Sequence, residues 1–568
     1  MTTLSVRTIA ANCGLFPPLL VKEDILGHDY FRTNSLKEKL IWMQKQCGAW
    51  EILPKDSRIL AIHAAVLSTN EILYFGGDEH SRDQHNANDI DHTRLFDVST
   101  GEITPISSPT TDVFCAGHAF LGDGRLLVGG GTEEWGVGEG DPGHGAHPHA
   151  LNFGGHRECW VYNPPERNWT QITDMNFQPG RDTGGGRWYP TLITLPNGEV
   201  LAFFGHPSRT DTRHRNSTPE RYSPASNSWT LLPAIAEDIP PPDVGPELNY
   251  PRLHVLPNGQ IFFATPVNGN RFYNPATGVF VGPTITPPPD PIYQGWFVTS
   301  VLLPLLPGDS YTPRVLLCGG SQPYRINLGE SSPTWRVAGT RTGTAADRIR
   351  ENLCAVILPT GDVFLSGGVE DSGSDLSDLT AVREGEIYSP GIDWDRGVYI
   401  SAEIWVSTQE ATVVRNYHSV ALLMPNGRVW TAGSSKNANQ GDPDDPTIAE
   451  KRIEVYKPSY DADPNRPEIT ASPVSIIYGQ SFEIQASSAA SIQRIALIRA
   501  GSVTHAFDAD QRYVGVAFNH VGGNRLVATA PPDGGVAPPG YYMLWLIDDA
   551  GRPCKLAKFI RVSVSFEV

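Results

Sequence analysis

Long apolar runs are missing from this 568-residue sequence, and no stretch of about 18 apolar residues is present that could span a membrane. Charged residues are also scarce, at 19% of the chain. The formal net charge of -18 leaves no broad basic surface for the phosphates of a nucleic acid. We therefore expect neither a membrane span nor a nucleic-acid partner.

Cysteines are few as well, with seven scattered along the chain and no Cys-x-x-Cys pair. This spacing predicts neither a zinc site nor a disulfide scaffold. The first residues, MTTLSVRTIAANCGLFPPLLVKED, show no signal peptide, because Arg7 and Asn12 interrupt the apolar segment that such a peptide needs. By sequence alone, these features favour a cytoplasmic protein.

Glycine, proline and aromatic residues are plentiful instead, with 56 Gly, 48 Pro and 9% aromatics. This composition is typical of many short strands joined by tight turns. A chain of this length also exceeds what one hydrophobic core usually organises, so more than one domain is expected.

One unit recurs along the chain: an apolar strand, a tight Pro/Asn/Asp-Gly turn, a second apolar strand and a Gly-rich end. Clear copies are CAGHAFLGDGRLLVGGG from Cys115, YPTLITLPNGEVLAFFG from Tyr189, YPRLHVLPNGQIFFATP from Tyr250, NLCAVILPTGDVFLSGG from Asn352 and YHSVALLMPNGRVWTAG from Tyr417. Weaker copies begin at Ile62 and Trp296. The Asn-Gly and Asp-Gly pairs supply the positive φ angles that a tight hairpin requires.

A second signature follows most copies, an aromatic strand that ends in a Pro or Ser turn, as in CWVYNPPERNWTQI and ERYSPASNSWTLL. Together the two signatures predict the four-stranded blade of a kelch-type β-propeller, and seven copies predict seven blades over residues 49–462. RIEVYKPSY, at 452–460, is expected to close the ring beside an early blade. An array of β-sandwiches is the alternative, which the Gly-rich ends and the period of the repeat disfavour.

The pattern changes after DADPNRPEI. Residues 465–568 contain alternating apolar strands such as SFEIQAS and RIALIRA, which predict a separate immunoglobulin-like β-sandwich. Residues 1–48 match neither pattern and form an N-terminal extension without an assigned role.

The repeat brings chemically distinctive side chains to one level of the predicted propeller. Aligning the copies on their turns places one residue of each at an equivalent position where the inner strand begins: Cys115, Tyr189, Tyr250, Asn352 and His418. Tyr417 and Trp296 lie one residue earlier. Each of these residues taken alone is more often structural, since Tyr and Trp usually pack and a lone Cys is usually a small buried apolar residue. Their coincidence of type and position favours a functional site.

At these residues the sequence resembles the copper radical oxidases, the family of galactose oxidase and glyoxal oxidase. The resemblance covers residues from about 48 to the end and is closest in pattern to bacterial glyoxal-oxidase-like members. It rests on four motifs, which are FCAGHAFLGDG around Cys115, GRWYPTLITLPNG around Tyr189, NYHSVALLMPNG around Tyr417 and His418, and VTHAFDADQRYV around His505.

The resemblance implies one copper ion held by Tyr189, Tyr417, His418 and His505. It also implies a thioether between Cys115 and Tyr189, which makes Tyr189 a radical cofactor. In galactose oxidase a Trp stacks over this thioether, and it lies shortly after the radical tyrosine. No Trp stands there in this chain, so Trp296 is the substitute we predict.

Such a site implies oxidation of a primary alcohol, a small aldehyde or a carbohydrate, with O₂ reduced to hydrogen peroxide. Tyr417 would accept the alcohol proton and Tyr189 would abstract the carbinol hydrogen. Because His505 belongs to the C-terminal domain, that domain is expected to insert a loop into the propeller channel. No domain precedes the propeller as one does in galactose oxidase, which disfavours galactose as substrate.

Several further expectations accompany this hypothesis. We expect a monomer, and the resemblance indicates an extracellular protein although no export signal is visible. The alternative function is a non-catalytic kelch-type propeller that binds a glycan or a protein partner. A loop with His144, His147, His149 and His156 has a composition that can bind metal, but its spacing fits no defined site.

Overall fold

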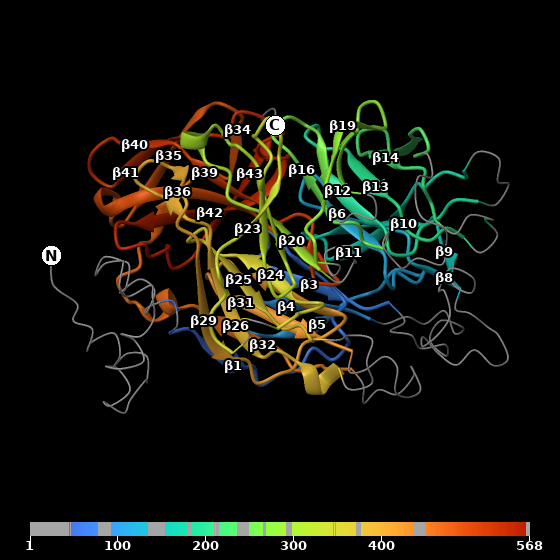
Figure 1. Ribbon diagram of the computed structural model, residues 1–568, viewed down its shortest axis with the longest axis horizontal. Coiled ribbons are helices and arrows are strands. Elements are labelled where there is room, and N and C mark those ends of the chain that lie inside the picture. The colour runs from blue at the N-terminus through green and yellow to red at the C-terminus, as the bar shows by residue number, and fades with distance from the viewer. Residues whose placement is uncertain are drawn as a thin grey trace.

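A computed structural model gives the fold of the chain (Figure 1). The structure describes Lys45 and residues 47–77, 92–134, 154–178, 184–208, 211, 215–235, 249–264, 269–290, 298–344, 346, 348–370, 377–435 and 449–563. Within these ranges the regular structure is almost entirely β, which confirms the predicted all-β class. The short 3₁₀ helices are η3 (Pro307–Asp309), η4 (Ser377–Thr380), η5 (Ser459–Ala462) and η6 (Ala489–Ser491).

Each hairpin of the repeat opens a separate antiparallel sheet. The first sheet contains β2 (His63–Val66), β3 (Glu71–Phe75), β4 (Thr93–Asp97) and β5 (Ile103–Pro105). The second contains β6 (Gly117–Phe120), β7 (Leu126–Gly129), β10 (Cys159–Asn163) and β11 (Asn168–Ile172). The third contains β12 (Thr191–Thr194), β13 (Val200–Phe203), β14 (Glu220–Ser223) and β15 (Ser228–Leu231).

Four further sheets repeat the same order of strands. The fourth contains β16 (Leu253–Val255), β17 (Ile261–Phe263), β18 (Asn270–Asn274) and β19 (Val279–Ile285). The fifth contains β20 (Thr299–Leu302), β21 (Arg314–Cys318), β22 (Tyr324–Asn327) and β23 (Trp335–Val337). The sixth contains β24 (Cys354–Ile357), β25 (Val363–Ser366), β26 (Glu384–Ser389) and β29 (Ile404–Glu410). The seventh contains β30 (Ser419–Leu423), β31 (Val429–Gly433), β32 (Glu454–Lys457) and β1 (Ala49–Ile52).

The first strands of these sheets are buried at every residue, whereas outer strands such as β11 and β23 are largely exposed. The first strands of neighbouring sheets contact one another: β6 contacts β12, β24 contacts β30, and β30 contacts β2. The predicted closing segment pairs with an early strand, since Lys457 of β32 lies opposite Ala49 of β1. It does so within the seventh sheet, so the two ends of the repeat region share one sheet.

The C-terminal residues form two more sheets, which lie at one side of the molecule in orange to red (Figure 1). One contains β33 (Ile469–Ala471), β35 (Ser481–Ala486), β41 (Arg525–Thr529) and β40 (Phe518–His520). The other contains β34 (Ser475–Ile477), β43 (Lys558–Ser563), β42 (Gly540–Asp548), β36 (Ile492–Arg499) and β39 (Tyr513–Val516). Burial alternates along β35, as expected of a strand with one face on a core. Two minor pairs are β8 (Thr132–Glu134) with β9 (Gly154–Gly155) and β27 (Ile392–Asp393) with β28 (Val398–Tyr399).

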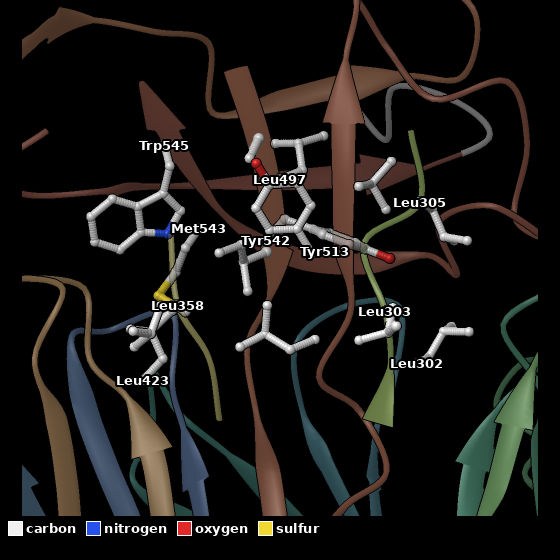
Figure 2. Close-up of a cluster of buried hydrophobic side chains, with 14 of the residues drawn as sticks. Leu302, Leu303, Leu305, Leu358, Leu423, Leu497, Tyr513, Tyr542, Met543 and Trp545 are labelled. Carbon is white, nitrogen blue, oxygen red and sulfur yellow. The ribbon is translucent and has the colours of Figure 1, made fainter. Parts of the chain in front are cut away.

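One hydrophobic core joins the repeat sheets to the C-terminal sheets (Figure 2). Its members from the repeat region include Leu302, Leu303, Leu305, Leu358 and Leu423, and those from the C-terminal sheets include Leu497, Tyr513, Tyr542, Met543 and Trp545. Backbone bonds reinforce the contact, because Leu305 N–H donates to Tyr513 O at 2.9 Å and Gly515 N–H donates to Leu305 O at 2.8 Å. The two regions are therefore packed as one body.

A hairpin from the C-terminal region enters the first repeat sheet. It consists of β37 (Ser502–Thr504) and β38 (Phe507–Asp508), and β37 pairs with β2 so that Thr504 lies opposite His63. The first sheet thereby grows to six strands. The turn of this hairpin contains His505.

The cysteine spacing predicted no disulfide scaffold, and the structure contains a disulfide at one described cysteine. Cys47 is disulfide-bonded, and its partner lies outside the described residues. The other described cysteines are buried and form no disulfide, and they are Cys115, Cys159, Cys318, Cys354 and Cys554. In the part of the chain that the structure describes, no helix has the length and apolar character to cross a membrane.

Candidate metal centre

Left-handed backbone marks the aligned position at the start of the inner strands. The φ angle is 56° at Cys115, 60° at Tyr189, 43° at Tyr250, 59° at Asn352 and 62° at His418. For residues other than glycine this conformation costs roughly 1–2 kcal/mol each. Its recurrence in five sheets supports the alignment of the repeats, and it directs these side chains out of the regular alternation of a strand.

Backbone hydrogen bonds link three of these residues across their sheets. The Tyr189 N–H donates to Cys115 O at 2.9 Å, and the Tyr250 N–H donates to Tyr189 O at 2.8 Å. The left-handed residues of the second, third and fourth sheets are therefore held at one level. This places the Cys115 and Tyr189 side chains beside each other.

Tyr417 and His418 are adjacent in sequence, yet both side chains face the same centre. Because β30 begins only at Ser419 and His418 is left-handed, the alternation of a strand does not apply to them. Their rings lie stacked, with centroids 3.8 Å apart and planes at 30°. His418 Nδ1 is 2.7 Å from the Ser435 hydroxyl, which fixes the orientation of the imidazole.

His505 reaches the same centre from the C-terminal hairpin. It and Ala506 are left-handed, with φ of 47° and 61°, and they form the turn between β37 and β38. Its Nδ1 is 2.7 Å from the Thr504 hydroxyl, while the Arg252 guanidinium donates to its carbonyl at 3.3 Å. The Thr299 hydroxyl donates to Ala506 O at 2.8 Å.

The segment after His505 is anchored to the inner strands around it. Asp510 accepts the Phe120 N–H at 3.1 Å and pairs with Arg499 at 3.0 Å. The Gln511 amide donates to Ala355 O at 2.9 Å and accepts the Ile357 N–H at 3.0 Å. In the structure, a loop of the C-terminal region therefore lies among the inner strands, as the sequence predicted.

Five of the predicted site residues meet at this buried centre. The sulfur of Cys115 and one ring nitrogen each of His418 and His505 lie within 4.8 Å of one another. Cys115 Sγ is 3.6 Å from His505 Nε2. The hydroxyls of Tyr189 and Tyr417 are hydrogen-bonded to each other, and both rings lie edge-on to His505 at 5.1 Å and 5.2 Å.

The protein environment keeps both phenols protonated when no cation is bound. Burial raises the pKa of Tyr189 well above its usual value, and the adjacent Cys115 and Tyr417 add to the rise. Burial also raises the pKa of Tyr417, with Cys115 contributing. A bound cation would reverse this preference, since it stabilises phenolate directly.

These residues fit a copper ion. Two imidazoles with phenolate oxygens form a donor set that suits Cu(II). Hydroxyls bond the Nδ1 atoms of His418 and His505, so that Nε2 is the remaining donor of each ring. Such outer hydrogen bonds are the usual means of orienting metal-binding histidines.

The predicted stacking residue Trp296 lies outside the described residues. Trp188, which the sequence reasoning missed, lies edge-on to Tyr189 with centroids 4.3 Å apart and planes at 81°. It is 1% exposed, so the Trp188–Tyr189 contact is buried. The sequence signal was available, because Trp188 directly precedes Tyr189 in the quoted motif.

Other residues near the centre had no predicted role. Tyr250 was aligned with the site but not assigned, and its ring lies 4.5 Å from that of His505. The ring of His63 lies 6.2 Å from that of His505, and the ring of His118 lies 5.3 Å from that of His63. Of the His-rich loop, only His156 is described, and it bonds Asp112 O at 2.7 Å and pairs with Glu158 at 3.0 Å, as a structural residue does.

Comparison with known proteins identifies the family. The glyoxal oxidase N-terminus family matches residues 152–460, and the galactose oxidase-like early set domain matches residues 466–562. The chain belongs to the glyoxal oxidase family. This confirms the resemblance inferred from the four motifs and the prediction of an oxidoreductase.

Relatives of this glyoxal oxidase family member include plant and fungal oxidases. The aldehyde oxidase GLOX of Vitis pseudoreticulata is 28% identical over 549 residues, which cover 88% of this chain and 95% of that protein. A galactose oxidase of Gibberella zeae is 27% identical, covering 83% of this chain and 64% of that protein. A solved structure of a fungal alcohol oxidase of the AA5 family in complex with copper shares the fold, with a TM-score of 0.68, 22% identity and coverage of 91% and 99%.

Proposed function

We propose that the protein is a copper radical oxidase that converts a primary alcohol or a small aldehyde to the next oxidation state and reduces O₂ to hydrogen peroxide. The observation that carries this proposal is the convergence of Cys115, two tyrosines and two histidines at one buried centre. They come from three repeat sheets and from the C-terminal hairpin. A propeller that only binds a partner has no need of this combination.

The fold around the centre supports a seven-bladed kelch-type propeller over residues 49–462. In this proposal each repeat sheet is a blade, and β1 closes the ring in the seventh blade. Residues 465–568 would form the immunoglobulin-like sandwich that contributes His505. The N-terminal extension, 1–48, has no part in this assignment.

The proposed cofactor includes a thioether between Cys115 and Tyr189. Its formation joins the cysteine sulfur to a ring carbon of Tyr189, with loss of the thiol hydrogen and one ring hydrogen to O₂. The sulfur donates electron density to the ring, which makes Tyr189 easier to oxidise. Copper, when bound, would supply the second one-electron oxidant and an open coordination position for the substrate oxygen.

The two tyrosines would remove both protons and one of the two electrons from the substrate, and the second electron would pass to copper, when bound. Tyr417 accepts the proton of the substrate hydroxyl, acting as the general base. Tyr189, as the radical, abstracts the hydrogen atom of the carbinol carbon. Their hydrogen-bonded hydroxyls place both groups at one point, and Trp188 packs edge-on with the radical ring.

The substrate class follows from the chemistry and from the relatives. Oxidation of a carbinol carbon applies to primary alcohols and to hydrated small aldehydes, and the curated relatives are named as aldehyde and galactose oxidases. The partners would therefore be small molecules and O₂, with the protein acting as a monomer. The disulfide at Cys47 favours maturation in an oxidising compartment.

A peroxide-coupled screen tests the proposal. Copper-loaded protein is assayed against primary alcohols, aldehydes and sugars, with Tyr189→Phe as the matched variant that keeps the ring. We expect peroxide from at least one class and a loss of at least a thousandfold in the variant. Peroxide formation by the variant at the rate of the unchanged protein would refute a radical role for Tyr189.

Intact mass measures the cross-link separately. Treatment with copper and O₂ should reduce the mass of the unchanged protein by two hydrogens, and it should leave Cys115→Ser and Tyr189→Phe unchanged. An unchanged mass in the parent protein would contradict the thioether.

A further inference from the structure

Tyr250 occupies the same backbone position as Cys115 and Tyr189, in the next sheet along the chain. It is 2% exposed and its φ of 43° is left-handed, a costly conformation for a tyrosine. Its N–H donates to Tyr189 O, and the Arg252 guanidinium donates to its carbonyl at 2.9 Å. Strained residues of this kind persist only where the surrounding contacts hold them in place, and they cluster at functional sites.

The ring of Tyr250 contacts two residues of the proposed centre. It lies against the His505 imidazole, with centroids 4.5 Å apart and planes at 32°. It also meets the Tyr189 ring edge-on, with centroids 4.9 Å apart and planes at 68°. The Tyr250 ring therefore packs against both the His505 imidazole, a proposed copper ligand, and the ring of Tyr189, the proposed radical.

The hydroxyl of Tyr250 has partners of its own. It donates to Ala116 O at 2.9 Å, next to Cys115 in the chain, and it also interacts with the Thr504 side chain. The bond to Ala116 O orients the ring and turns its oxygen to the backbone of the second sheet. A carbonyl oxygen does not take up the proton that a phenol loses on oxidation, so this bond also disfavours a radical on Tyr250.

We propose that Tyr250 is a positioning residue, whose ring holds the His505 imidazole in the orientation that binds copper. The inference rests on the proposed copper site and extends it to a third tyrosine that is not a ligand. Thr504 fixes the Nδ1 side of His505 through its hydroxyl, and Tyr250 fixes the plane of the ring. Loss of supporting contacts around a metal ligand typically costs 10–100-fold in metal affinity.

The test compares Tyr250→Phe with Tyr250→Leu in the full chain. Copper affinity is measured by competition with a chelator, and the number of coordinated nitrogens is read from the electron paramagnetic resonance spectrum of the Cu(II)-loaded protein. We expect Tyr250→Phe to bind within about threefold of the parent, because the ring remains. We expect Tyr250→Leu to bind roughly 10–100-fold more weakly, with an altered nitrogen signature.

Tyr273→Leu is the matched control for general destabilisation. Tyr273 is a fully buried tyrosine in β18 of the same sheet, and its ring packs on Phe203 at 5.0 Å. This variant should lose thermal stability as Tyr250→Leu does, and it should bind copper like the parent. Equal copper affinities in Tyr250→Leu and Tyr273→Leu would overturn the proposal, as would equal losses in Tyr250→Leu and Tyr250→Phe. Because copper binding is measured without substrate, a protein that binds copper normally and forms no peroxide refutes the oxidase and leaves this inference standing.

Discussion

Single backbone angles determine which side chains reach the centre. Tyr417 and His418 would face opposite sides of a regular strand, and the left-handed φ of His418 brings both rings to one side. The sequence indicated this position through the register of the repeats, but not the angle. The angle arises from tertiary contacts such as the hydrogen bond from Ser435 N to Tyr417 O, which short-range patterns do not contain.

Ser435 should control copper affinity through His418. Ser435→Ala removes the hydroxyl bonded to Nδ1, and we expect a 10–100-fold weaker copper complex, whereas Ser435→Thr should keep most of the affinity. Ser300→Ala is the control, because that hydroxyl bonds His254 Nε2 at 2.8 Å and His254 belongs to no proposed site. Competition titration with a copper chelator measures all three. Equal affinities in Ser435→Ala and Ser300→Ala would contradict the orienting role.

At the scale of the element, buried Arg–Glu pairs connect the strands of a sheet to the site residues. Arg187, two residues before Tyr189, donates to Phe204 O at 2.8 Å and pairs with Glu220 of β14 at 3.0 Å. Arg350, two residues before Asn352, pairs with Glu386 of β26 in the same manner. The recurring pair ties the left-handed position to the third strand of its own sheet.

Glu220→Gln should strongly destabilise the fold. It leaves the Arg187 charge buried without its carboxylate, because both side chains are 0% exposed. Removing one partner of a buried pair costs roughly 3–5 kcal/mol in free energy of unfolding. Glu199→Gln breaks the more exposed pair with Arg221 in the same sheet and should cost less than about 1 kcal/mol. Urea unfolding measures both, and similar losses would argue against the buried pair as the cause.

The hairpin that presents His505 has a buried carboxyl at its base. Asp508 Oδ1 accepts N–H bonds from Ser502 at 3.0 Å, Asp510 at 3.0 Å and Gln511 at 2.9 Å. Burial outweighs these bonds, and with Asp510 nearby it raises the pKa of Asp508 to about 6. The folded protein therefore binds this proton more tightly than the unfolded chain, whose Asp pKa is about 3.9.

The contribution of Asp508 to stability should fall as pH rises from about 4 to 6, because the raised pKa favours folding only while Asp508 is protonated. Asp508→Asn keeps the acceptor oxygen and removes the ionisation. We expect its stability relative to the parent to increase over this window by roughly 2–3 kcal/mol, since one pKa unit is about 1.4 kcal/mol. Urea midpoints at several pH values, in the same metal-loading state, measure the difference. A difference that stays constant with pH would refute the assignment.

At the scale of the whole molecule, the sequence predicted the repeated hairpins and the candidate site residues better than the contacts between distant segments. Periodic apolar runs and rare residue types are local signals that can be identified in a sequence. They indicated the hairpin repeats, the change of pattern near residue 465, and the cluster of Cys115, Tyr189, Tyr417, His418 and His505. The identity of β1 as the partner of β32 and the contact of Tyr250 with His505 were not predicted. They depend on contacts between residues far apart in sequence, which no single segment encodes.

The shared core implies that the repeat sheets and the C-terminal sheets unfold together (Figure 2). Asp510→Ala tests this at their junction, since it breaks the buried pair with Arg499 and removes the acceptor of the Phe120 N–H. We expect a loss of roughly 3–5 kcal/mol, with copper release and the change in tryptophan fluorescence shifting together along one urea transition.

The matched control is Glu483→Ala, which removes a pair with Arg525 that is about half exposed in the outer C-terminal sheet. It should change the free energy of unfolding by less than about 1 kcal/mol. If Asp510→Ala released copper at a lower urea concentration than it lost fluorescence, the C-terminal sheets would be unfolding separately. Coincident transitions would mean that the ligand His505 is held in place by the stability of the whole chain. The hairpin that carries it pairs with the first repeat sheet, and Ala506 in its turn belongs to the shared core.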